Sequence, residues 1–109
     1  MSAMDEMVQK CGKLKTVERR SDSADYKEWV FLNSDLRQWC SFIEEIFGPE
    51  CKPAGKEPTA EDKKVTKDYG GVRSDQILYK RIDGDQIVIV MLWPWGDKQH
   101  TTLKMASFK

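Results

Sequence analysis

The stretch that decides the fold is Ile87-Val88-Ile89-Val90-Met91-Leu92-Trp93, which lies between the turn signals Asp83-Gly84 and Pro94-Trp95-Gly96-Asp97. Its length and β-branched residues predict a strand, and because successive side chains of a strand point to opposite faces, both faces of this one are apolar. Such a strand needs cover on both sides. A chain of 109 residues has few other elements to supply that cover, so the pattern predicts a partner.

Two further strands extend this segment into an antiparallel meander, Gln76 to Ile82 before it and Gln99 to Phe108 after it. A two-residue turn at Asp83-Gly84 would pair Ile82 with Asp85. In that register one face carries Leu78, Ile87, Ile89, Met91 and Trp93, and the opposite face carries Ile77, Tyr79, Val88, Val90 and Leu92. A three-residue loop would regroup the residues, but both faces would stay apolar.

The clearest helix runs from Asp35 to Phe47, because its apolar residues recur at intervals of three and four. The residues of this stripe are Leu36, Trp39, Cys40, Ile43, Ile46 and Phe47. Asn33 or Ser34 is the expected N-cap, and Gly48-Pro49 is the expected stop. This helix should cover one face of the sheet.

The remaining segments are less regular. A short helix is expected from Met4 to Cys11, followed by a hairpin of a basic edge strand, Lys13 to Arg20, and a stronger strand, Tyr26 to Leu32. Residues 49–58 carry three of the four prolines and read as a mobile loop. A weak helix should begin at Thr59, with few apolar anchors.

These elements predict one α+β domain spanning residues 1–109. Its antiparallel sheet consists of the C-terminal three-stranded meander plus one or two N-terminal strands, and one main amphipathic helix packs against it.

Charge and cysteine content argue against several classes of function. Eighteen Lys and Arg balance eighteen Asp and Glu, so no overall field favours nucleic acid or an anionic membrane. No run approaches the ~18 apolar residues that a membrane span needs, so no membrane partner is expected. Cys11, Cys40 and Cys51 match neither a zinc site nor a redox pair, and they are interpreted as free thiols in a reducing cytoplasm.

No motif for catalysis, a metal or a cofactor is found, so the sequence predicts a protein that is not an enzyme. His100 is the only histidine and has no evident orienting partner. Glu44 and Glu45 are adjacent on a helix and point about 100° apart. Asp83-Gly84-Asp85 lacks the later ligands of a calcium loop. An enzyme whose site is shared across a dimer and includes His100 is the least favoured hypothesis.

The favoured hypothesis is a small interaction module that binds a protein partner or forms a homodimer. Its predicted contact residues are those of the Trp-rich turn and the uncovered sheet face: Trp93, Trp95, Ile87, Ile89 and Met91. Trp is over-represented among binding hot spots, although the same rings could instead close the end of the core.

The alternative hypothesis is an accessory domain that binds RNA or single-stranded nucleic acid through the basic stretch 10–20. In strand geometry Lys13, Lys15 and Arg19 would share a face. With Arg20, Tyr26 and Trp29 they could follow a phosphate backbone and stack bases. A solvated face neutralised by nearby acids is the simpler reading, because the net charge is zero.

Overall fold

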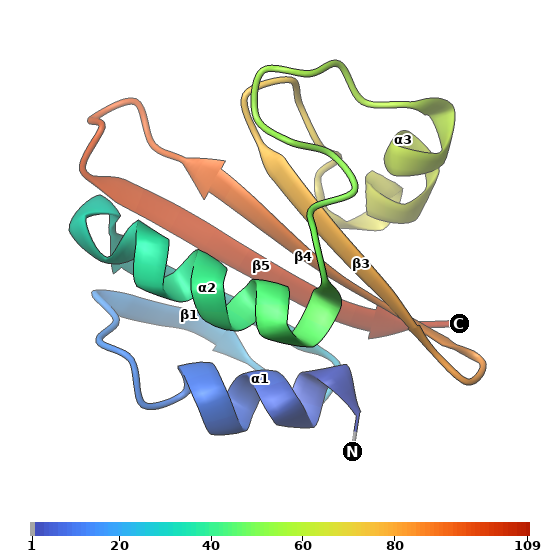
Figure 1. The fold of residues 1–109 in the computed structure, drawn as a ribbon, viewed down its shortest axis with the longest axis horizontal. Helices are drawn as coiled ribbons and strands as arrows, with labels where there is room; N and C mark the ends of the chain where they lie inside the picture. The colour runs from blue at the N-terminus through green and yellow to red at the C-terminus, as the bar shows by residue number, and fades with distance from the viewer. Residues whose placement is uncertain (1) are drawn as a thin grey trace.

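The computed structural model describes residues 2–109, which form three α-helices and one five-stranded antiparallel sheet (Figure 1). The elements are α1 (Ala3–Cys11), β1 (Glu18–Asp22), β2 (Tyr26–Leu32), α2 (Leu36–Phe47), α3 (Ala60–Thr66), β3 (Ile77–Asp83), β4 (Gln86–Pro94) and β5 (His100–Phe108). The strand order is β1-β2-β5-β4-β3, so β1 and β3 are the edges. The predicted α+β class, with its C-terminal meander, is confirmed.

Helices α1 and α2 pack against one face of the sheet, which we call the α1/α2 face (Figure 1). The apolar stripe of α2 meets the inward side chains of β2, β4 and β5 there. Trp39 of α2 is fully buried, and its ring stacks on Phe31 of β2 at a centroid distance of 4.6 Å. Ser2 caps α1 by accepting a hydrogen bond from the Asp5 amide. This face therefore holds the main core.

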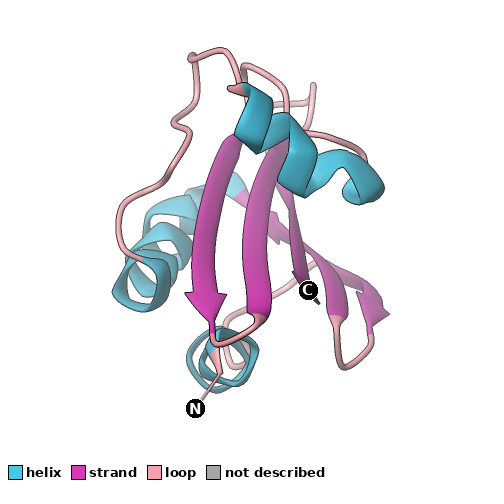
Figure 2. Ribbon diagram, turned by 90° about the vertical axis from the view of Figure 1, so that its right-hand side faces the viewer, coloured by secondary structure: helices cyan, strands magenta, loops and turns pink. Residues whose placement is uncertain are grey.

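The opposite face, which we call the α3 face, is covered by α3 and the segment that follows it, as the arrangement of α3 over the β3–β4 hairpin in Figure 2 shows. Thr59 and Asp62 form a capping box that fixes the start of α3. Val65 and Val72 then pack on β3 and β4, and Ile89 and Met91 of β4 are 0% exposed. The prediction that the chain cannot cover this face is therefore wrong at Ile89 and Met91.

The β3–β4 turn differs from the prediction by one residue. Asp83 pairs with Gln86, so the turn residues are Gly84 and Asp85, and Ile82 pairs with Ile87. Gly84 has a φ of +61°, which glycine adopts without strain. Because the pairing shifts by two positions, an even number, the two predicted groups of face residues are unchanged.

Two other local predictions need correction. The N-terminal edge strand is shorter than expected, because only Glu18–Asp22 pairs with β2 and residues 13–17 precede the strand. No side chain caps α2: residues 33–35 form a 3₁₀ turn, and the Asn33 side chain instead accepts a hydrogen bond from Thr101 of β5. A contact between distant segments has replaced the expected local cap.

The segment 49–58 is joined to β3 at its start. Lys52 forms an isolated antiparallel bridge with Leu78, and its fully buried ammonium group donates hydrogen bonds to the carbonyl oxygens of Pro53, Ser74 and Gln76. The predicted mobility of this loop stays a prediction, but Lys52 occupies the outer side of one end of β3.

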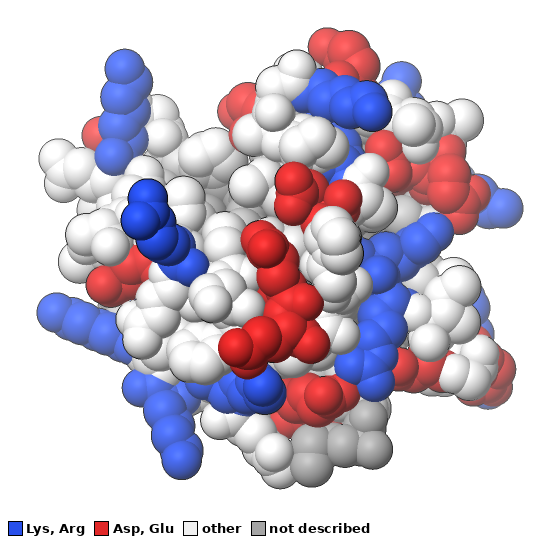
Figure 3. Space-filling view, in the orientation of Figure 1, with Lys and Arg blue, Asp and Glu red and all other residues white. Residues whose placement is uncertain are grey.

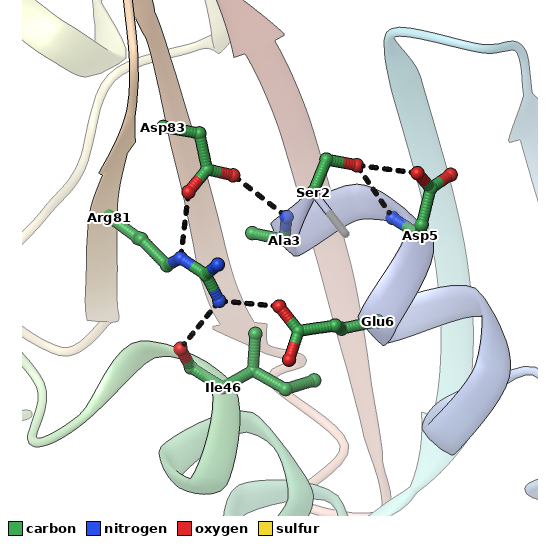
Figure 4. A network of polar contacts seen from close by, with 7 residues as sticks. All are labelled: Ser2, Ala3, Asp5, Glu6, Ile46, Arg81 and Asp83. Atoms are coloured by element: carbon green, nitrogen blue, oxygen red, sulfur yellow. Dashed lines mark hydrogen bonds and ion pairs between the residues drawn. The ribbon is translucent and has the colours of Figure 1, made fainter.

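A polar network around Arg81 of β3 joins the edge strand to both helices of the α1/α2 face (Figure 4). The guanidinium donates to Glu6 of α1 at 2.6 Å, to Asp83 at 2.8 Å and to the Ile46 carbonyl oxygen of α2 at 3.2 Å. Asp83 also accepts from the Ala3 amide at 2.7 Å. These contacts raise the pKa of Arg81, mainly through the Glu6 hydrogen bond. They hold β3 against the two helices.

Candidate functional site

The two tryptophans of the predicted contact surface lie on the α3 face and are both half-buried. The Trp95 ring contacts the Arg20 guanidinium, 5.3 Å from its centroid, and the His100 ring, whose centroid is 4.7 Å away. Its indole N–H donates to Thr102 Oγ1 at 2.7 Å. A ring held on three sides by its own chain closes the end of the sheet and leaves little surface for a partner.

Trp93 is held in a similar way. The Lys104 ammonium nitrogen lies 3.5 Å from the centroid of its ring, a cation–π contact. The backbone of Gly70 passes so close that a Cβ at this position would lie 2.7 Å from Trp93 Cη2. Lys104 is itself half-buried, and this burial lowers the pKa of its ammonium group.

The most exposed large apolar side chain of the described residues lies at the hairpin end of the α3 face. Ile82 is 66% exposed, the highest value among the large exposed apolar residues of the described chain. Its pairing neighbour Ile87 and the next residue on this face, Phe108 of β5, are half-buried. We call these three residues the Ile82 patch. Of the predicted sheet contacts, Ile87 lies in this patch, whereas Ile89 and Met91 lie beneath α3.

The Ile82 patch borders an edge strand whose outer hydrogen-bonding groups are only partly used. Leu78 exchanges two backbone hydrogen bonds with Lys52, so its N–H and C=O point away from β4. Along an antiparallel strand these groups alternate in direction, so those of Lys80 and Ile82 also point outward. Among the described residues, no backbone or side-chain group forms a hydrogen bond with these outward groups. We call these two residues the free β3 edge.

The other edge of the sheet has the features that keep edge strands from pairing. β1 has five residues, is mostly exposed and consists of charged residues and one serine. Its register shifts between Arg19 and Ser21, which marks a bulge. Short length, charge and bulges all oppose pairing with another chain. The two edges therefore differ: β1 is protected, and half of β3 is open.

The structure does not bring the predicted nucleic-acid-binding residues together. Lys13 and Lys15 precede β1, and Trp29 is 1% exposed and faces α2 with the Arg19 guanidinium over its ring. Arg20 and Tyr26 belong to the opposite side of the sheet: Arg20 contacts Trp95 there, and Tyr26 stacks on Tyr69. On the α1/α2 side, Figure 3 shows acidic side chains in the middle with basic side chains around them.

The sequence did not predict the polar pair formed by Asp97 and His100. Asp97 Oδ2 lies 2.6 Å from His100 Nδ1, so His100 does have an orienting carboxylate. Asp97 also accepts from the amides of Gln99 and His100, and these hydrogen bonds lower its pKa. The i,i+3 spacing within a turn was the available signal. Because the carboxylate organises the β4–β5 turn, the pair has a structural role there.

Nucleophile and metal chemistry find no support in the geometry. Cys11 is buried under α1 and Cys40 lies on α2, both on the α1/α2 side, whereas His100 faces the α3 side, so neither thiol can pair with it. Burial raises the pKa of Cys11 to about 12, which opposes thiolate formation. Among residues 2–109 no cluster of three or more His, Cys, Asp or Glu residues could hold a metal ion.

A cavity of about 630 Å³ opens between the start of α1 and the β1–β2 and β3–β4 turns. Its carboxylates already have partners in the chain: Asp83 binds Arg81 and the Ala3 amide, and Asp5 accepts from Ser2. A smaller cavity of about 200 Å³ lies between Leu36, Leu92 and Pro94 and is apolar. Neither cavity gathers several unpaired polar groups of the kind that orient a small ligand.

Comparisons of the chain with protein-family models, curated proteins and solved structures found no match. Within the described residues, no helix is both long enough and apolar enough to cross a membrane.

Proposed function

We propose that the protein is a small protein-binding module without chemistry of its own, and that it docks through the free β3 edge and the adjoining Ile82 patch. The observation that carries the proposal is the 66% exposure of Ile82 on an edge strand whose neighbouring apolar residues remain half-buried. Exposed apolar surface beside unpaired strand edges is a feature of sites that bind another chain.

The proposed mode of binding is the addition of a strand. An extended segment of the partner would accept from and donate to the outward backbone groups of Lys80 and Ile82, which gives orientation. An apolar side chain of that segment would cover Ile82 and the exposed parts of Ile87 and Phe108. At about 25 cal/mol per Å² of apolar area, even a few hundred Å² would contribute appreciably to binding.

The proposed docking surface includes only one of the five contact residues that the sequence predicted. Ile87 remains a contact residue. Ile89 and Met91 support α3 from below, and Trp93 and Trp95 close the far end of the same face. The reducing cytoplasm predicted from the cysteines stays part of the proposal and is supported by the free thiols of Cys11, Cys40 and Cys51.

The experiment that tests the proposal compares proteins retained from a cell extract by the wild type, Ile82→Lys and Val17→Lys. Val17 is the matched control, because it is also an exposed apolar residue, at 52%, but precedes the opposite edge strand. We expect a protein bound by the wild type and by Val17→Lys to be lost with Ile82→Lys. Equal retention by all three chains, from an extract to which untagged copies of this chain have been added, would contradict the proposal.

Nucleic-acid binding remains an alternative prediction that no feature of the geometry favours. It would require affinity for single-stranded RNA that falls steeply with added salt, since phosphate contacts release counterions. Neutralising Lys13, Lys15 and Arg20 together should then abolish binding. A lack of RNA binding at low salt would remove this alternative.

A further inference from the structure

We propose that the strand that pairs with the free β3 edge is β3 of a second copy of this chain, antiparallel to the first, with Ile82 opposite Ile82. This inference rests on the proposed function, because it names the partner of the same site. The geometry of β3, its charges and the position of Lys52 together select this register.

Hydrogen bonding limits the registers that two copies of β3 can adopt around a twofold axis. The outward backbone groups belong to Leu78, Lys80 and Ile82, so only these residues can form hydrogen-bonded pairs across the new interface. If one strand moved by a single residue relative to the other, the outward N–H and C=O groups of the two strands would no longer face each other. The twofold axis must therefore pass through an outward residue or through the residue midway between two outward residues.

Lys52 already pairs with Leu78, which blocks the registers that would bring a second strand to this end of β3. With Lys80 opposite Lys80, the second copy would place its Ile82 beside Leu78, where Lys52 already forms a bridge. That arrangement would also set two ammonium groups against each other, which is unfavourable between directly opposed residues. The register centred on Lys80 is therefore excluded on two grounds.

Charge decides among the registers that remain. Centring on Arg81 would oppose two guanidinium groups, and centring on Asp83 would oppose two carboxylates. Centring on Ile82 instead places Arg81 of each copy opposite Asp83 of the other. These residues already carry the polar network of Figure 4, in which Asp83 binds Arg81 and is partly exposed. The second copy thus meets each charge with its opposite.

The apolar side of the interface matches as well. In this register the two Ile82 side chains lie opposite each other on the α3 side, next to Ile87 and Phe108 of each copy. The paired segment is short, since Lys52 closes one end of β3 and the turn at Gly84 closes the other. A small interface of this kind gives a weak, reversible dimer.

Disulfide trapping tests the register. In a hydrogen-bonded antiparallel pair the Cα atoms are about 5.5 Å apart, within the range of a disulfide. The Ile82→Cys variant, in a Cys51→Ser chain that removes the exposed native thiol, should form a covalent dimer with oxidised glutathione. Lys80→Cys and Val17→Cys, in the same background, should crosslink at least about tenfold more slowly, because their counterparts are not opposite.

Sedimentation equilibrium gives an independent measurement on chains without new cysteines. We expect the wild type and Val17→Lys to dimerise increasingly up to about 1 mM, a range suited to a weak interface, and Ile82→Lys to remain monomeric. A monomeric wild type at the highest concentration, or trapping of Lys80→Cys as fast as Ile82→Cys, would overturn the proposed pairing.

The two proposals fail separately. If the wild type is monomeric but Ile82→Lys still loses a protein that Val17→Lys retains from the extract, the second-copy inference is wrong and the docking surface stands. If the wild type and Ile82→Lys each dimerise to the same extent, the dimer uses another surface and the inference is again wrong. Equal retention by every variant, both of proteins from the extract and of untagged copies of this chain, would reject the docking surface itself.

Discussion

The distinction between Ile89 and Ile82 gives the sharpest prediction about the fold. Both isoleucines lie on the α3 face, but Ile89 is 0% exposed and Ile82 is 66% exposed. The same substitution, isoleucine to alanine, should therefore have very different effects on the free energy of unfolding. The cover that α3 supplies is the physical cause of the difference.

The magnitudes follow from burial. Ile89→Ala removes three buried carbon groups, worth about 2.4 kcal/mol in transfer free energy. The cavity left in a site that cannot collapse fully adds about 1 kcal/mol, so the expected loss is about 3.5 kcal/mol. Ile82→Ala removes a side chain with about a third of its surface covered and leaves no cavity, so we expect a loss of about 0.8 kcal/mol.

Urea unfolding followed by tryptophan fluorescence measures both values. At a protein concentration of about 1 µM, a weak dimer contributes nothing to stability. With a slope of about 1.2 kcal/mol per M, the midpoint should fall by about 3 M for Ile89→Ala and by less than about 1 M for Ile82→Ala. Equal shifts for the two variants, or a shift below about 1 M for Ile89→Ala, would refute the reasoning that α3 closes this face.

Three further predictions concern the contacts that hold the helices and the thiol chemistry. Arg81→Met should lower the free energy of unfolding by about 2 kcal/mol, because charged hydrogen bonds to α1 and α2 are lost. The control Arg73→Met, at an exposed position, should change the free energy of unfolding by less than about 0.5 kcal/mol. Equal effects of the two substitutions in urea unfolding would contradict the role of the network. Thr59→Ala should cost about 1 kcal/mol by the same assay, because the capping box of α3 is lost, and an unchanged midpoint would show that the cap is dispensable. Burial raises the pKa of Cys11 to about 12, against 9.0 for a free thiol, because it disfavours the thiolate. The stability of the folded protein is therefore unaffected by this group below pH 9 and falls between pH 9 and 12, by up to about 1.4 kcal/mol per pH unit. A Cys11→Ala chain should lose less stability over that pH range, and an identical pH profile for both chains would contradict this assignment.

The sequence predicted the elements well because local patterns determine them. Strand Tyr26–Leu32 was predicted with its exact ends, and the two groups of residues on the faces of β4 were assigned correctly, since strand alternation survives a shift of the turn by an even number of positions. The helix from Leu36 to Phe47 follows directly from its apolar spacing. These properties depend on neighbours in sequence.

Predictions that depended on tertiary contacts were less successful. The weak helix after Thr59 has few apolar residues of its own, yet Val65 belongs to the same buried cluster as Ile89 and Met91 and helps to complete the second layer of the core. No pattern in residues 60–69 reveals that small contacts of this kind are enough to cover a strand. For this reason the prediction that Ile89 and Met91 lie uncovered is wrong.

The free β3 edge could not be located from the sequence for a similar reason. Its position depends on the strand order and on the bridge between Lys52 and Leu78, two residues far apart in the chain. The sequence did place Ile82 and Ile87 at the ends of adjacent strands, but only the arrangement of α3 shows which of the two groups of apolar residues remains open.

Amide hydrogen exchange at two protein concentrations, measured by NMR spectroscopy, shows whether a second chain pairs with β3 at Ile82. We expect the Leu78 amide, which donates to Lys52, to be protected at both about 50 µM and about 1 mM, whereas the Ile82 amide should exchange freely at the lower concentration and gain protection at the higher one. Protection of the Ile82 amide that does not change with concentration would contradict pairing at the free β3 edge.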